Sequence, residues 1–132
     1  MTAHQLLRPD GLVHSPAFSH VAIVPPGATT IYVGGQNAVD GAGALVGAGD
    51  VAAQSVRALQ NVAVALAAAG ASFKDVVQWT VLFVDGVDIA AGYAAIAGDL
   101  ASDSPGLITA ARVVGLGVPG ALVEISAIAA VV

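Results

Sequence analysis

A change in hydrophobic period along the chain is the strongest constraint on its fold. In residues 76–84 the side chains alternate between two dissimilar sets, with Val77, Trp79, Val81 and Phe83 on one side and Gln78, Thr80, Leu82 and Val84 on the other. A period of two residues predicts a β-strand. The segments before and after it follow a period near 3.6, which predicts one helix between Asp50 and Gly70 and a second over residues 88–100.

The predicted helices carry signals at their ends. Asp50 and Asp88 are placed to accept hydrogen bonds from free backbone N–H groups, and Gly70 suits the left-handed residue that follows a helix. Along the first helix we expect two stripes, a polar one of Gln54, Arg57, Gln60 and Asn61 and a largely apolar one of Val51, Ser55, Leu59, Val62 and Leu66.

Short apolar segments bounded by turn residues predict five further strands, at residues 4–8, 20–24, 30–34, 109–114 and 122–131. We expect the second and third of these to form a hairpin, and the last two to form another. A glycine-rich loop occupies residues 41–49. The order β-β-β-α-β-α-β-β predicts a single α+β domain over residues 1–132, with a six-stranded mixed sheet and both helices on one face.

The other face of that sheet needs a partner, because the chain is short of charge. Only 10% of its residues are charged and 57% are apolar, against roughly 25% charged in an average soluble domain. Residues 113–132 have the length of a membrane span, about 20 residues, but they contain Glu124, Pro119 and three glycines. We therefore expect burial between copies of the chain, since obligate interfaces resemble a divided core.

Charge and cysteine content exclude several functions. Four Lys and Arg residues in a chain of net charge −5 provide no basic surface for a phosphate backbone, so no nucleic-acid partner is expected. The chain has no cysteine and no leader-like segment, so we expect a cytoplasmic protein without a membrane partner. His4, His14 and His20 lack the spacing of metal ligands, and we expect no metal site.

The glycine motif between Gly115 and Gly120 does not predict a cofactor. It matches a dinucleotide-binding pattern, but Pro119 and a strand follow where that pattern requires a helix. The loop over residues 41–49 also lacks the Lys-Ser/Thr pair of a phosphate-binding loop. We therefore expect no cofactor.

Glu124 is the charged residue with the most informative position. It is the only glutamate and lies in the most apolar predicted strand, where an ionised carboxylate is costly without a partner. It is the candidate catalytic residue, because a carboxylate in such a place suits general acid or base chemistry. A structural ion pair with Arg112, on the preceding strand, is the alternative. Tyr32 and Trp79 lie in alternating strands and are expected in the core.

A series of residues spread over nearly the whole chain resembles the RidA/YjgF family, also called endoribonuclease L-PSP-like. They are Ile31, Tyr32, Val33, Gly34, Gly35, Gln36, Gly49, Asp50, Gln54, Asn61, Leu66, Ala69, Gly70, Ala71, Asp75, Val76, Val77, Thr80, Val123, Glu124, Ile125, Ala127, Ile128 and Ala129. The resemblance implies a chorismate-mutase-like fold, a homotrimer and small-molecule clefts at the subunit interfaces. It also implies deaminase or hydrolase activity on reactive enamines and imines.

The chain departs from this family at the residue that binds the substrate carboxylate. Active members clamp that carboxylate with an arginine at the start of the fifth strand, a bidentate task for a guanidinium. Two alignments place Ile108 or Thr109 at this position, and neither side chain forms an ion pair. Arg112 lies on the same strand face as Ile108, about 13 Å further along, and is a candidate for a relocated clamp.

Other candidate ligand-binding positions are both changed and retained. Phe18 stands where the family usually has tyrosine, Gly34 where it has serine, and Tyr93 where it often has asparagine. Gly35, whose backbone approaches the ligand, is retained. Glu124 is retained as well, and the resemblance implies that it holds the attacking water.

These changes lead to three hypotheses. The first is a RidA-like homotrimer that binds a small, less anionic metabolite between subunits with Glu124 as polar anchor, because loss of the arginine argues against imine deamination. The alternative is a hydrolase or deaminase of an enamine or imine that uses water positioned by Glu124. The third is an interaction scaffold without a ligand.

Overall fold

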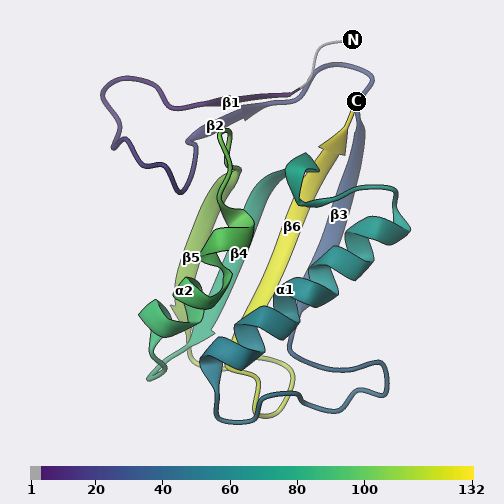
Figure 1. The fold of residues 1–132 in the computed structure, drawn as a ribbon, viewed down its shortest axis with the longest axis vertical. Coiled ribbons are helices and arrows are strands. Elements are labelled where there is room, and N and C mark those ends of the chain that lie inside the picture. The colour runs from purple at the N-terminus through teal and green to yellow at the C-terminus, as the bar shows by residue number, and fades with distance from the viewer. Residues whose placement is uncertain (1–3) are drawn as a thin grey trace.

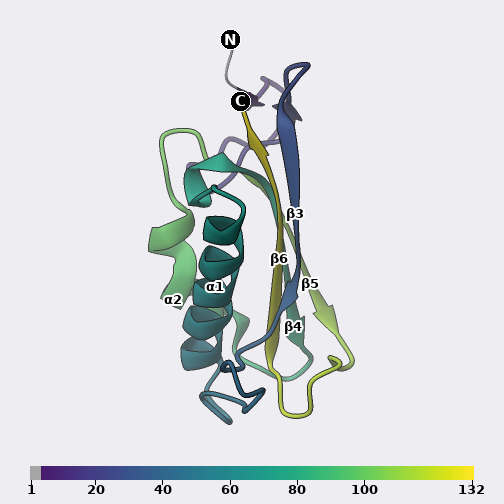
Figure 2. The same ribbon diagram turned by 90° about the vertical axis from the view of Figure 1, so that its right-hand side faces the viewer.

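The structure, a computed structural model, describes residues 4–132 as a four-stranded sheet covered on one face by two helices (Figures 1 and 2). The strand order is β3-β6-β4-β5. The elements are β3 (Thr29–Gln36), α1 (Val51–Ala68), the short 3₁₀ helix η1 (Phe73–Asp75), β4 (Val76–Val84), α2 (Ile89–Leu100), β5 (Leu107–Val113) and β6 (Val123–Val131). A separate two-stranded ribbon contains β1 (Gln5–Leu7) and β2 (Val21–Ile23). The predicted α+β class and the placement of both helices on one face are confirmed.

The strand pairing differs from the prediction. The six strands form a 2 + 4 arrangement instead of one sheet, because β2 pairs with β1 and not with β3. The predicted hairpin of β5 and β6 is also wrong, since β4 lies between them. A helical crossover through α2 sets β5 parallel to β4. The nine-residue β6 runs antiparallel to both of its neighbours, β3 and β4.

The hydrophobic core lies between the sheet and the helices. It contains the side chains of β4 and β6 that face the helices, together with apolar side chains of α1 and α2. Its largest fully buried members include Phe83, Leu66, Ile96, Ile125, Val62 and Val81. Trp79 is 2% exposed and belongs to this core, as expected. Tyr32 is 76% exposed, so its predicted core position is wrong. The side chains of β3 alternate between the two faces of the sheet as predicted, but that of Tyr32 lies on the face that no helix covers.

The helix ends follow the sequence signals. The Asp50 carboxylate accepts a hydrogen bond from the Ala53 N–H, and the Asp88 carboxylate accepts one from the Ala91 N–H. Gly70 follows α1 with a φ of 76°, a conformation that favours glycine. Within residues 4–132, the structure contains no helix with the length and apolar character needed to cross a bilayer.

Gln54 does not lie on an exposed polar stripe of α1, as the sequence pattern predicted, but is fully buried. Its amide Nε2 donates to the carbonyls of Gly47 and Gly120, each at 3.2 Å, and its Oε1 accepts from the Leu122 N–H at 2.8 Å. These bonds join the glycine-rich loop to the segment just before β6. The buried amide thereby satisfies backbone groups that no regular element pairs.

A second amide network lies about two helical turns further along α1. Asn61 donates to the carbonyls of Asn37 and Val39, both at 2.9 Å, and accepts from Arg57 Nε at 3.2 Å. The Asn37 side chain in turn donates to the Val123 carbonyl at 3.0 Å. The chain leaving β3 is thus fixed to both α1 and the beginning of β6.

We predict that Gln54→Ala lowers the free energy of unfolding by about 3 kcal/mol, because it leaves buried backbone groups without partners and opens a cavity. The exposed Gln60 on the same helix provides the control, and Gln60→Ala changes the same free energy by less than about 0.5 kcal/mol. Chemical denaturation of both variants at one protein concentration measures the difference. Equal stability of the two variants would contradict the role of the buried amide.

Candidate functional site

The uncovered face of the sheet carries two of the candidate side chains from the sequence, Glu124 and Thr109. Figure 2 shows both helices on one side of the sheet and none on the other. Alternation and register place the following side chains on this open face: Tyr32 from β3, Glu124, Ser126 and Ile128 from β6, Gln78, Thr80, Leu82 and Val84 from β4, and Thr109 from β5. Glu124 is the only ionisable carboxylate among them.

Glu124 lies near the beginning of β6, beside the end of β3. It is the second residue of β6, its register partner on β4 is Leu82, and its side chain is half-buried. On the other side it lies against the backbone of Gly35. A Cβ atom at Gly35 would be 2.5 Å from Glu124 Cδ and 2.6 Å from Oε2, so only glycine fits there without moving the carboxylate.

A register irregularity in β3 makes this contact possible. The regular pairing of β3 with β6 is interrupted between Val33 and Gln36, which leaves Gly34 and Gly35 outside the ladder. Such irregularities bend a strand and redirect its side chains. Gly34 differs from its neighbour, because a Cβ there would meet no atom within 4 Å.

An open groove of about 280 Å³ lies further along the open face, and Glu124 is not among the residues that line it. Its lining residues are Tyr32, Val33, Gly34, Gln78, Thr80, Ser126, Ala127 and Ile128. The contributions of Gln78, Thr80 and Ser126 were not predicted from the sequence. These three side chains lie on the same face of two neighbouring strands. Identifying them requires the register of β4 with β6, which the sequence does not provide.

The two residues that align with the family arginine lie on opposite faces. Ile108 pairs in register with Trp79 and packs against the core on the covered side. Thr109 pairs with Thr80 and is exposed on the open face. Of the two alignments, the one through Thr109 therefore places the substituted residue on the face that carries Glu124.

Arg112 does not pair with Glu124. Its register partner is the buried Phe83, so its side chain lies on the covered side, where its Nη1 is 3.5 Å from the Val87 carbonyl. β4 also separates its strand from β6. The predicted structural ion pair is wrong because the two residues occupy opposite faces of non-adjacent strands.

Phe18 and Tyr93 also lie away from Glu124 within one chain. The Phe18 ring packs edge to face on His20, with centroids 5.4 Å apart, and the adjacent Ser19 N–H donates to the Gly106 carbonyl just before β5. Tyr93 lies on α2 and packs against the covered core, where burial raises the pKa of its hydroxyl.

Apart from Ile108, Tyr93 and Arg112 on the covered side, the candidate residues form two separate groups. Gly34, Gly35 and Glu124 lie where β3 meets β6, whereas Thr109 and Phe18 lie at β5 and the loop beside its beginning. Strands β6 and β5 are two strand spacings apart, roughly 10 Å. One chain does not bring the two groups together into a site.

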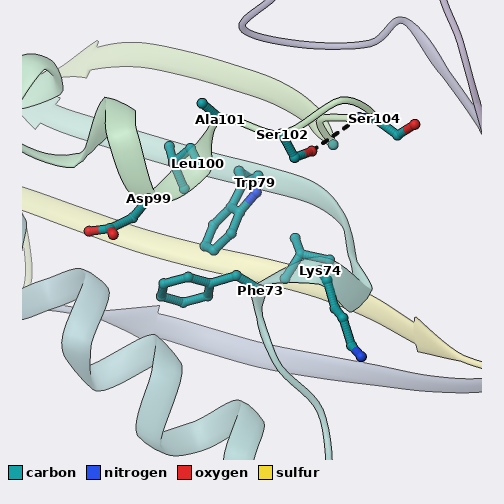
Figure 3. Close-up of a pocket in the computed structure, with 10 residues that line it drawn as sticks. Phe73, Lys74, Trp79, Asp99, Leu100, Ala101, Ser102 and Ser104 are labelled. Atoms are coloured by element: carbon teal, nitrogen blue, oxygen red, sulfur yellow. Dashed lines mark hydrogen bonds between the residues drawn. The ribbon is translucent and has the colours of Figure 1, made fainter.

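A further hollow, of about 170 Å³, lies on the covered side between η1 and the end of α2. Its floor contains the rings of Phe73 and Trp79, which pack edge to face at 5.4 Å. Figure 3 shows the charged ends of Lys74 and Asp99 pointing away from these rings. None of the candidate residues from the sequence lines this hollow. Among residues 4–132, no three His, Asp or Glu side chains are grouped to hold a metal ion.

Comparison with known proteins identifies relatives along nearly the whole chain. The family described as Endoribonuclease L-PSP matches residues 12–131. The chain is 30% identical to the Rid-family protein YyfB from Yersinia pestis, with a TM-score of 0.84, and the match covers 97% of this chain and 98% of the other.

Two structures from E. coli are also similar. The YjgF gene product is 30% identical, with a TM-score of 0.68 and coverage of 80% and 83%. TdcF, solved with bound serine, is 25% identical, with a TM-score of 0.67 and 98% coverage of both chains. No curated protein is similar enough to this chain to count as a match.

We predict that Gly35→Ala displaces the Glu124 carboxylate by about 1 Å, since carbon atoms prefer separations of 3.5–4.0 Å. Gly34→Ala is the matched control, because its Cβ meets no atom within 4 Å. Crystal structures of the two variants measure the displacement. An unmoved carboxylate in Gly35→Ala would show that Gly35 does not position it.

Proposed function

Because the chain belongs to the endoribonuclease L-PSP family, we propose that it forms a homotrimer and binds a small metabolite in clefts between subunits, with Glu124 as polar anchor. The observation that carries this proposal is the division of the candidate residues between the two sides of the open face. Thr109 and Phe18 of one copy complete a site with Gly35 and Glu124 of the next. A cleft between copies explains why one chain holds only half of each site.

The character of the open face supports association. Leu82, Ile128 and the largely exposed Tyr32 lie on it, and no element of residues 4–132 covers them. These apolar side chains lie beside Gln78, Thr80 and Ser126, and exposed apolar groups rimmed by polar residues are typical of an interaction site. Burial of this face between copies would also remove from water part of the apolar surface that the few charged residues of the chain do not cover.

The residue at Thr109 limits what the cleft binds. TdcF is a relative solved with serine, which carries a carboxylate, and this supports a small-molecule cleft for the family. In this chain a threonine hydroxyl occupies the position of the guanidinium that would bind this carboxylate. A carboxylate without its ion pair in a partly dry cleft loses roughly several kcal/mol of binding free energy. We therefore propose a ligand that is less anionic than an imino acid.

Hydrolysis of an enamine or imine is the second candidate function. The close approach of Glu124 to Gly35 favours it, because a carboxylate held in one orientation is suited to positioning water. RNA cleavage, which the family description names, has less support. Arg8, Arg57, Lys74 and Arg112 are spread over the ribbon, α1, η1 and β5 and form no phosphate-binding surface. The cytoplasmic location stays a prediction.

We predict that Tyr32→Glu dissociates the trimer, because it places a charge within the buried face. Val64→Glu is the control, since Val64 is 71% exposed on α1, a helix of the covered side. Sedimentation velocity measures the mass of each variant and of the unmodified protein. A monomeric unmodified protein, or a trimeric Tyr32→Glu variant, would overturn the proposed interface.

The two candidate functions predict different rates of ammonia release. With 2-aminoacrylate generated enzymatically, we expect ammonia to appear at the buffer rate, because Thr109 does not hold the substrate carboxylate. Glu124→Gln then gives the same rate. Acceleration by the unmodified protein that Glu124→Gln abolishes would establish the hydrolase and refute the binding-only function.

A further inference from the structure

We infer that the ligand of Glu124 is a small organic ammonium compound without a carboxylate. This inference rests on the proposed function, because it specifies the ligand of the same cleft. It depends on where the folded chain places its charges, and on the neutral side chains that surround Glu124.

None of the four cationic side chains of the sequence lies on the open face. Arg8 donates to the Asp103 carbonyl at the ribbon, and Arg57 donates to Asn61 on α1. Lys74 belongs to η1, and Arg112 contacts the Val87 carbonyl on the covered side. The positive charge that would balance the Glu124 carboxylate is therefore not supplied by this face of the chain.

The immediate surroundings of Glu124 are neutral. Its neighbours are the backbone of Gly35, the apolar Leu82 across the β4 ladder and, two residues along β6, Ser126. Association of subunits removes water from this half-buried carboxylate, and an unpaired charge in such a place is costly. A ligand ammonium group restores the balance through a charge-assisted hydrogen bond.

The groove that begins two residues along β6 from Glu124 also lacks positive charge. Its polar lining groups are the hydroxyls of Tyr32, Thr80 and Ser126 and the amide of Gln78, none of which carries a positive charge. A carboxylate bound there faces the like charge of Glu124 without compensation. The open face of a second copy carries no Lys or Arg either, and a cation from elsewhere on that copy is the competing explanation, which Arg112→Gln tests below.

The test uses three probes with one carbon skeleton and different charges. They are 3-methylbutan-1-amine, which is an ammonium ion at neutral pH, the neutral 3-methylbutan-1-ol, and the anion 3-methylbutanoate. Amide chemical shifts of Gly34 and Gly35 locate binding at the cleft, and titration gives the affinity. We expect the amine to bind about tenfold tighter than the alcohol, as one charge-assisted bond allows, and the acid to be the weakest.

Variants identify the group that recognises the charge. Glu124→Gln keeps the shape of the side chain and is expected to reduce amine affinity to that of the alcohol. Asp99→Asn, an exposed acid on α2, is expected to leave it unchanged. Thr109→Arg, which adds a cation to the open face, is expected to strengthen binding of 3-methylbutanoate.

The outcomes separate this inference from the function on which it rests. Equal or tighter binding of the alcohol or the acid, at the same amides, overturns the inference and leaves the binding function intact. Amine affinity that survives Glu124→Gln overturns it as well. Binding of the acid as tight as that of the amine, if Arg112→Gln abolishes it, also overturns the inference, because the balancing charge then belongs to Arg112 of an adjacent subunit. No response of Gly34 or Gly35 to any probe overturns both the inference and the binding function.

Discussion

The position of β6 between β3 and β4 is the constraint on which the rest of the structure depends. Because β6 pairs on both sides, its ladder hydrogen bonds are satisfied within the chain, and one face of its side chains fills the core below the helices. The same pairing places Glu124 between Leu82 and the Gly34-Gly35 irregularity. Gln54 and Asn37 then fix the segments that lead into this strand, through buried hydrogen bonds to Gly120, Leu122 and Val123. The position of the candidate carboxylate is therefore a consequence of a central strand and two buried amides.

Local signals in the sequence predicted the positions of the helices and strands well. They did not predict which strands pair with one another. The strand over residues 76–84 was predicted at its observed bounds, and Asp50, Gly70 and Asp88 mark the helix ends as expected, because caps and alternation depend on neighbouring residues. The partner of a strand depends on the whole topology. Hairpin signals favoured β2 with β3 and β5 with β6, yet the α2 crossover sets β5 beside β4 and leaves the central place to β6.

The same limit applies to the site. Glu124 stood out because a lone glutamate in an apolar strand is visible without a structure. The sequence did not show which side of the sheet each residue of β5 faces. The register of β5 with β4 shows that Thr109, and not Ile108, lies on the open face. The prediction that Gln54 is exposed was wrong for a related reason. A polar stripe on a helix is exposed only where no loop packs over it. The loops before α1 and β6 do pack over it, and the amide is their anchor.

The distribution of acids separates Glu124 from the other carboxylates by function. The remaining eight acids are aspartates, and several of them cap the backbone: Asp40 accepts from the Ala42 and Ala44 N–H groups, Asp75 from Ser72, and Asp50 and Asp88 from the first turns of the helices. The N–H groups of Ala44 and Ala42, with a smaller contribution from Arg57, lower the pKa of Asp40. A short side chain suits such local bonds. Glu124 is longer, lies inside a strand and reaches from β6 to the backbone of Gly35 on β3, which lies outside the regular ladder. Glu124 therefore does not act as a helix or turn cap, in contrast to these aspartates.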